Sequence, residues 1–130
     1  ILFYLCTKTH NIPLLLEKGA NIYAYGPIGI ENFSKLYPEG KNGKGNITYS
    51  SKIEEVLSGA HICFIFTEWK VVKAIKPETY KSLMQVPLVF DGRNIYSVEH
   101  MEVASVEYHS VGRRPTIFNY LGEILISDLN

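Results

Sequence analysis

The 130-residue sequence has few cysteines, no excess of either charge and no long hydrophobic run. Its two cysteines, Cys6 and Cys63, lie in apolar segments without CxxC spacing, which predicts buried, reduced thiols in a cytoplasmic protein. Thirteen basic residues balance thirteen acidic ones, so no overall field favours nucleic acid or an anionic membrane surface as a partner. Any anionic ligand must therefore be bound by local groups.

The apolar segments are also too short to cross a bilayer. Residues 1–6 fall far below the roughly 20 residues that a transmembrane helix needs, and no signal-peptide pattern surrounds them. We therefore expect no membrane partner. The chain begins with Ile rather than Met, which predicts that it was cut from a longer protein.

Several catalytic signatures are missing. No GxGxxG follows a predicted strand, and the glycine-rich residues 40–45 have neither dinucleotide-binding nor P-loop spacing. The four histidines, His10, His61, His100 and His109, show no metal-ligand spacing. Neither a nucleophile elbow nor a paired-carboxylate motif is present. We expect no bound metal and no catalytic residue in this chain.

The sequence does contain apolar segments that alternate with amphipathic ones. Strands are predicted at residues 20–25, 47–49, 61–66, 86–90 and 106–111. Helices are predicted at residues 11–19, 31–36, 51–59, 77–84 and 97–104, with an exposed loop at 39–45 and a possible last helix in the tail 113–130. Ser51 and Glu54 have the spacing of a capping box, Pro77 suits a first helical turn, and Ser97 suits an N-cap.

Strands that alternate with helices in this way predict an α/β fold. We expect one domain over residues 1–130, built as a three-layer, Rossmann-like open parallel sheet with helices on both faces. Ligands of such sheets bind beyond the carboxyl ends of the strands. Two polar loops follow strong strands, Thr67-Glu68-Trp69 and Asp91-Gly92-Arg93-Asn94, and both are expected on that side.

The chemistry of the second loop centres on Arg93. Its planar, permanently charged guanidinium suits phosphate or carboxylate, and Gly92 lets the backbone approach a ligand closely. Asp91 can either orient Arg93 or accept hydrogen bonds from the loop amides. The alternative is an ordinary Asp-Gly turn with a solvated arginine. In the first loop, Trp69 suits the core better than a ligand platform, and Glu68 suits a helix start.

A series of segments resembles the C-terminal domain of the UDP-glucose/GDP-mannose dehydrogenase family. The resemblance covers about residues 14–115, in order and with suitable spacing. Its segments are LEKGANIYAYGP (16–27), EN (31–32), SGAHI (58–62), FTEW (66–69), VFDGRN (89–94) and YHSVGR (108–113). Thr-Glu-Trp and Asp-Gly-Arg-Asn after successive strands are the most specific combination.

This resemblance implies an enzyme that oxidises the C6 alcohol of a nucleotide sugar, such as UDP-glucose, to a carboxylate with two NAD molecules. It implies that Arg93 contacts the UDP-sugar, with Asp91, Gly92 and Asn94 in the same substrate-binding loop. NAD and the catalytic cysteine would belong to the N-terminal and central domains of the full-length enzyme, which would be the partners of this domain. The chain alone is then not expected to bind NAD or to catalyse.

The sequence also departs from the family pattern. Residues 6–11 are shorter than the family's first loop, so Lys8 is not assigned the substrate-holding role of the family's lysine. Gly26 stands where the family has an aspartate. Two hypotheses follow: a UDP-sugar-binding domain, or a degenerate or stand-alone homologue that serves as a structural or partner-binding module.

Overall fold

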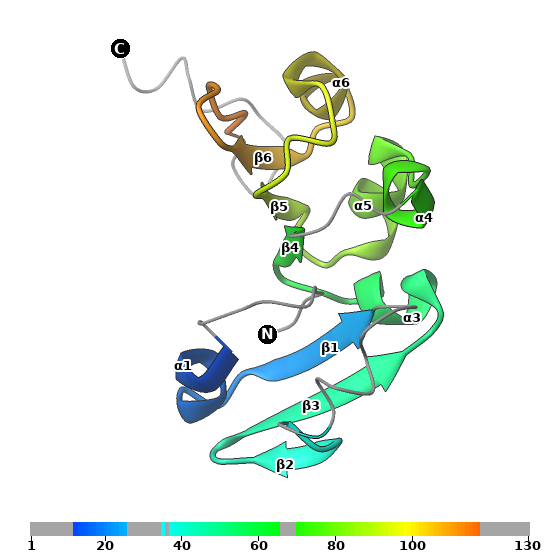
Figure 1. The fold of residues 1–130 in the computed structure, drawn as a ribbon. Helices are drawn as coiled ribbons and strands as arrows, with labels where there is room; N and C mark the ends of the chain where they lie inside the picture. The colour runs from blue at the N-terminus through cyan, green and yellow to red at the C-terminus, as the bar shows by residue number, and fades with distance from the viewer. Residues whose placement is uncertain (1–11, 26–34, 36, 66–69, 118–130) are drawn as a thin grey trace.

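The computed structural model describes residues 12–25, 35, 37–65 and 70–117, along which helices alternate with strands (Figure 1). The elements are α1 (Ile12–Glu17), β1 (Asn21–Tyr25), β2 (Gly40–Asn42), β3 (Gly45–Ser50), α3 (Ile53–Leu57), β4 (Cys63–Ile65), α4 (Lys70–Lys73), α5 (Pro77–Leu83), β5 (Leu88–Asp91), α6 (Val98–Val103) and β6 (Glu107–Ser110). The predicted Rossmann-like α/β class is confirmed. The single domain over 1–130 stays a prediction, because both ends lie outside the described residues.

The strands form two three-stranded sheets, with orders β1-β3-β2 and β4-β5-β6. In the first sheet β1 pairs with β3 in parallel, whereas β2 pairs with β3 in antiparallel fashion. The second sheet is parallel throughout. The prediction of an entirely parallel sheet is therefore wrong for β2. The strand predicted at residues 106–111 is observed as β6, which lies at one end of the order of the second sheet.

The antiparallel strand arises in residues 39–45, which were expected to form an exposed loop. Asn42 instead pairs with Gly45 around a two-residue turn, and its first residue, Gly43, has a φ of 61° that glycine adopts easily. A Cβ atom on Gly45 would lie 2.3 Å from the carbonyl oxygen of Ala20, so β3 begins where only glycine fits. The glycine-rich stretch is a hairpin because of these two positions.

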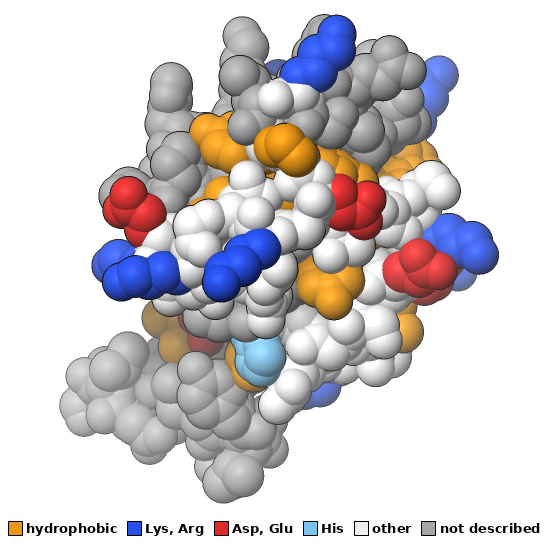
Figure 2. Space-filling model, turned by 90° about the horizontal axis from the view of Figure 1, so that it is seen from below, with side chains coloured by type: hydrophobic (Ala, Val, Ile, Leu, Met, Phe, Trp, Pro, Cys, Tyr) orange, Lys and Arg blue, Asp and Glu red, His pale blue; other side chains and the backbone are white. Residues whose placement is uncertain are grey.

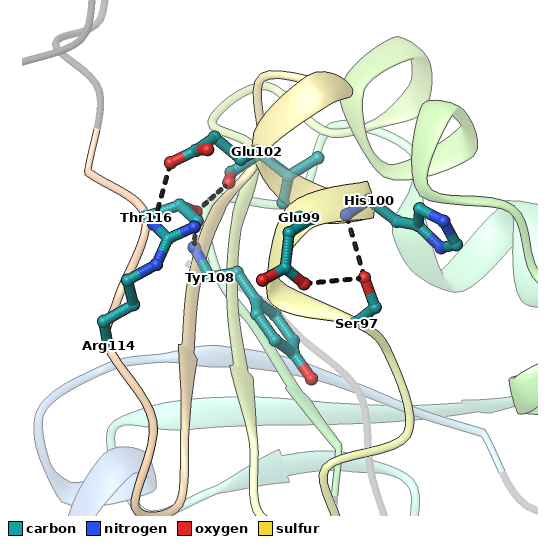
Figure 3. Close-up of polar contacts among 8 residues, drawn as sticks. Ser97, Glu99, His100, Glu102, Tyr108, Arg114 and Thr116 are labelled. Carbon is teal, nitrogen blue, oxygen red and sulfur yellow. Dashed lines mark hydrogen bonds and ion pairs between the residues drawn. The ribbon is translucent and has the colours of Figure 1, made fainter.

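The helix ends bear out some sequence signals and contradict one. Pro77 occupies the first turn of α5, and the Ser97 hydroxyl accepts a hydrogen bond of 3.0 Å from the His100 amide at the start of α6, as predicted (Figure 3). The capping box at Ser51 is wrong. The N-cap of α3 is Lys52, whose side chain has no acceptor for a capping bond. The Lys52 amide donates to the Ser50 hydroxyl at 3.1 Å.

Other segments differ from the predictions or lie outside the described residues. α4 was not predicted. Residues 113–117 are not helical, and Thr116 instead forms an antiparallel bridge with Tyr108 beside β6. The rest of the predicted tail helix, nearly all of the helix predicted at 31–36, and Cys6 in the N-terminal segment lie outside the described residues.

One cluster of buried side chains extends across both sheets and the helices that pack on them. α1 packs against β3, α3 packs against β1 and β3, and α6 packs against β6. The fully buried large residues are Ile22, Ile47, Val56, Leu57, Ile65, Val72, Tyr80, Val89, Met101, Val106 and Tyr108. Cys63 belongs to this core and is a free thiol, as predicted.

The buried hydroxyl of Tyr96 links the core to the C-terminal end of α4. It donates to the carbonyl oxygens of Ile75 at 2.7 Å and Val72 at 3.1 Å, and lies 2.8 Å from the hydroxyl of Tyr80. Helix ends leave carbonyl oxygens without intrahelical partners, so a donor at this position is stabilising. Because a tyrosine has a single hydroxyl proton, which Tyr96 gives to a carbonyl, Tyr80 must be the donor in the tyrosine pair.

Three rings form an aromatic row across the second sheet. Phe64 of β4, Phe90 of β5 and His109 of β6 are direct neighbours in the strand register. The ring centroids of Phe64 and Phe90 are 5.5 Å apart, and those of Phe90 and His109 are 4.6 Å apart, with nearly parallel planes in both pairs. The neighbouring positions Cys63, Val89 and Tyr108 face the buried core. Successive side chains of each strand therefore lie on opposite faces of the sheet, as expected for β-strands.

Candidate functional site

The predicted Asp91–Asn94 loop begins at the carboxyl edge of the second sheet. Asp91 is the last residue of β5 and aligns with Ile65, the last of β4, and with Ser110, the last of β6. The Gly92 amide still donates to the Ile65 carbonyl at 2.8 Å, after which the chain leaves the sheet. The loop after β5 and the turn after β6 therefore emerge side by side at the edge where ligands of such sheets bind.

Asp91 is buried, with 2% of its surface exposed, and its carboxylate is surrounded by donors. Oδ1 accepts from the Arg93 amide at 2.8 Å, and Oδ2 accepts from the Ile95 amide at 2.9 Å and from the Tyr108 hydroxyl. Of its two predicted roles, the structure shows the second, which is to accept hydrogen bonds from the loop amides. A buried carboxylate is tolerated only when such donors satisfy it, so Asp91 fixes the path of the loop.

Asn94 fixes the other end of the loop. Its φ of 55° lies in the left-handed region, which asparagine adopts more readily than most residues. The side-chain amide donates to the Val111 carbonyl at 2.9 Å, and its oxygen accepts from the Val111 amide at 2.8 Å. One side chain thus makes the pair of bonds that a neighbouring strand residue would make. Asn94 joins the loop to the turn after β6.

Gly92 and Arg93 lie between these two fixed points, and both are exposed. The backbone amide of Arg93 is bound by Asp91. The substrate-binding role of these residues stays a prediction. Thr67, Glu68 and Trp69, the other predicted loop, lie outside the described residues.

Sequence reasoning assigned no role to Tyr108 or Arg113, which complete the site. The Arg113 guanidinium donates from Nη2 to the Tyr108 hydroxyl at 2.8 Å, from Nη1 to the Tyr96 carbonyl at 2.7 Å and from Nε to the Ser110 hydroxyl at 2.9 Å. The only earlier signal was that residues 108–113 took part in the family resemblance. No periodicity or spacing connects them with Asp91, because the connection is made across two strands.

The protonation of Tyr108 suits its place between a carboxylate and a guanidinium. Burial, followed by the hydrogen bond to the Asp91 carboxylate, raises the pKa of Tyr108 well above its usual value. The hydroxyl therefore keeps its proton and donates it to Asp91 while accepting from Arg113. Burial likewise raises the pKa of the Cys63 thiol, with the Asp91 charge as the second cause, so this cysteine is a neutral core residue.

The charges elsewhere on the protein are mixed. On the face that Figure 2 shows, Lys and Arg side chains are interspersed with Asp and Glu over the described residues. In the same part of the chain no three His, Cys, Asp or Glu side chains come together as metal ligands would. No helix among the residues that the structure describes is both long and apolar enough to cross a membrane.

The strand-end loop and the parallel sheet define a Rossmann-like α/β domain with a candidate ligand-binding edge. A sequence model described as "UDP-glucose/GDP-mannose dehydrogenase family, UDP binding domain" matches residues 8–98. The chain therefore belongs to this family and contains its UDP-binding domain, which confirms the resemblance.

Relatives among known proteins agree with this assignment. The chain is 36% identical to UDP-glucose 6-dehydrogenase YwqF of Bacillus subtilis (strain 168) over 98 residues, which are 75% of this chain and 21% of that protein. It is 34% identical to TuaD, a UDP-glucose 6-dehydrogenase of the same strain, over 102 residues, or 78% of this chain and 21% of the relative. For the UDP-glucose 6-dehydrogenase of Rickettsia bellii (strain RML369-C) the identity is 29% over 100 residues, or 77% of this chain and 22% of the relative. The chain spans about a fifth of the length of these curated relatives.

Proposed function

We propose that this domain binds the UDP part of a nucleotide sugar and that the Arg93 guanidinium contacts its anionic oxygens. The observation that carries the proposal is the internal bonding of the loop. The amides of Arg93 and Ile95 both donate to Asp91, so they are not available to a phosphate. The exposed side chain of Arg93 is then the cationic group that the loop presents, and guanidinium groups bind phosphate oxygens with strong, directional hydrogen bonds.

This arrangement also bears on NAD. In a dinucleotide-binding turn, free backbone amides and a glycine-rich helix start hold the pyrophosphate. In the Asp91–Asn94 loop the amides of Arg93 and Ile95 are bound by Asp91, so this loop does not fit the pyrophosphate of NAD. On our proposal, NAD and the oxidation of the sugar C6 alcohol belong to the rest of a longer UDP-glucose 6-dehydrogenase-like enzyme. The N-terminal and central domains of that enzyme would be this domain's partners.

The proposal can be tested by calorimetric titration of the purified 130-residue chain with UDP-glucose, UDP and GDP. We expect saturable binding of the uridine ligands, and we expect Arg93→Ala to weaken it about 10-fold or more, the factor for losing a hydrogen bond to a charged group. Arg114→Ala is the matched control, because Arg114 is also an exposed arginine but lies outside the Asp91–Asn94 loop, where it pairs with Glu102 at 2.9 Å (Figure 3).

Two results would contradict the proposal. Equal losses in Arg93→Ala and Arg114→Ala would show that Arg93 has no special contact with the ligand. An absence of uridine binding by a folded chain would favour the alternative from the sequence, a structural or partner-binding module. The cytoplasmic location that the sequence suggests stays a prediction.

A further inference from the structure

We propose that Arg113 is a positioning residue for Arg93. By holding the Tyr108 hydroxyl against the Asp91 carboxylate, Arg113 keeps the loop of residues 92–94 in the single conformation that presents Arg93 to the nucleotide sugar. This inference rests on the proposed function of Arg93. Arg113 lies on the turn after β6, whereas Arg93 lies on the loop after β5.

The first support is the continuous series of contacts from Arg113 to the loop. Arg113 Nη2 donates to the Tyr108 hydroxyl at 2.8 Å, that hydroxyl donates to Asp91 Oδ2, and the two Asp91 oxygens accept from the Arg93 and Ile95 amides. Each donor and acceptor in this series has one consistent direction. The position of the Arg93 backbone is therefore determined by a network that Arg113 completes.

The second support is the charge balance of the network. Asp91 is a buried carboxylate. The cation in this series is the Arg113 guanidinium, which is linked to the carboxylate through the Tyr108 hydroxyl. The guanidinium carbon also lies 5.5 Å from the centroid of the Tyr108 ring, close enough for a cation–π contact. Hydrogen bonds in such a series polarise one another, so the cation strengthens the Tyr108 bond to the carboxylate.

The third support is that the turn carrying Arg113 also carries the second attachment of the loop. Asn94 makes its paired bonds with Val111, two residues before Arg113. Arg113 itself is anchored to the Tyr96 carbonyl and the Ser110 hydroxyl. The turn after β6 therefore holds the loop at two points, through the Arg113 bond to Tyr108 and through the bonds between Val111 and Asn94.

The test compares Arg113→Lys and Tyr108→Phe with Arg114→Lys in the 130-residue chain. Lysine keeps the positive charge but lacks the planar fork that bonds three partners at once. Phenylalanine keeps the buried ring and removes only the hydroxyl. Arg114 is the adjacent arginine in the sequence and pairs with Glu102 instead, so its variant controls for the loss of an arginine in this turn.

The first measurement is amide hydrogen exchange at Arg93 and Ile95, followed by NMR. We expect exchange at both amides to be about 10-fold faster in Arg113→Lys and Tyr108→Phe, the factor for weakening a hydrogen bond to a charged group. Arg114→Lys should match the wild type. Unchanged exchange in both test variants would overturn the proposal.

The second measurement is UDP affinity, which separates positioning from general destabilisation. We expect Arg113→Lys to weaken UDP binding about 10-fold, whereas Ile47→Val, a small core change in the other sheet, should leave the affinity unchanged even at equal loss of stability. Faster loop exchange with unchanged affinity would overturn the positioning role. If Arg93→Ala weakens binding but Arg113→Lys does not, only this inference fails. A wild-type chain that binds no UDP overturns the proposed function and this inference with it.

Discussion

Removal of the Tyr96 hydroxyl should destabilise the protein far more than its single oxygen atom suggests. In Tyr96→Phe, the Ile75 carbonyl loses the donor that lies 2.7 Å away, and the Tyr80 hydroxyl loses the acceptor at 2.8 Å. Each buried polar group that loses this bond costs roughly 1–3 kcal/mol, so for the two groups we expect a loss of about 2–6 kcal/mol in the free energy of unfolding. Tyr80→Phe removes only the donor and should cost about 1 kcal/mol.

Urea unfolding followed by circular dichroism measures both variants and the double variant. The double variant should lose less than the sum of the single losses, because both single variants break the same bond between the Tyr80 and Tyr96 hydroxyls, which the double variant loses only once. Tyr23→Phe is the control, since Tyr23 is 36% exposed. A loss below about 0.5 kcal/mol in Tyr96→Phe, the size of an ordinary surface substitution, would refute this reasoning.

Two further predictions concern the core thiol and the start of β3. Because burial raises the folded-state pKa of Cys63 above its ordinary value of 9.0, the unfolded chain loses this proton first, and stability falls as the pH rises above about 9. Unfolding free energies between pH 8.5 and 10 should therefore decline less steeply in Cys63→Ala, by up to about 1.4 kcal/mol per pH unit, and equal slopes would contradict the assignment. Gly45→Ala places a Cβ 2.3 Å from the Ala20 carbonyl oxygen and should cost about 1–3 kcal/mol in the same urea assay; a neutral result would show that the strand shifts freely.

Most of the fold could be predicted because apolar runs and helix-start residues act locally. The apolar segments coincide with β1, β4, β5 and β6. Pro77 begins α5, and Ser97 is the N-cap of α6. The strand predicted at residues 47–49 is confirmed as the middle of β3. β2 and its hairpin with β3 could not be predicted in this way, because the glycines and polar residues of that stretch are typical of a loop. Residues 40–42 form a strand through their pairing with β3, which is a tertiary effect.

The candidate site was predicted only where it is local. Asp91 and Arg93 follow a strong strand and carry charges, so the sequence indicates them directly. Tyr108 and Arg113 become part of the site only because β6 lies next to β5 with Ser110 opposite Asp91. The partner of a buried carboxylate on a neighbouring strand depends on this register, which a single sequence does not reveal.

The aromatic row of Phe64, Phe90 and His109 has a consequence for the uniqueness of the fold. Each strand of the second sheet contributes one ring at the same level, so a slip of β5 by one residue would separate Phe90 from both neighbours. The same slip would turn Asp91 from the core to the opposite face, because side chains alternate along a strand. The stacked rings therefore favour the observed register. A misaligned pairing of β5, which would displace the start of the Arg93 loop, would lose both aromatic contacts at once.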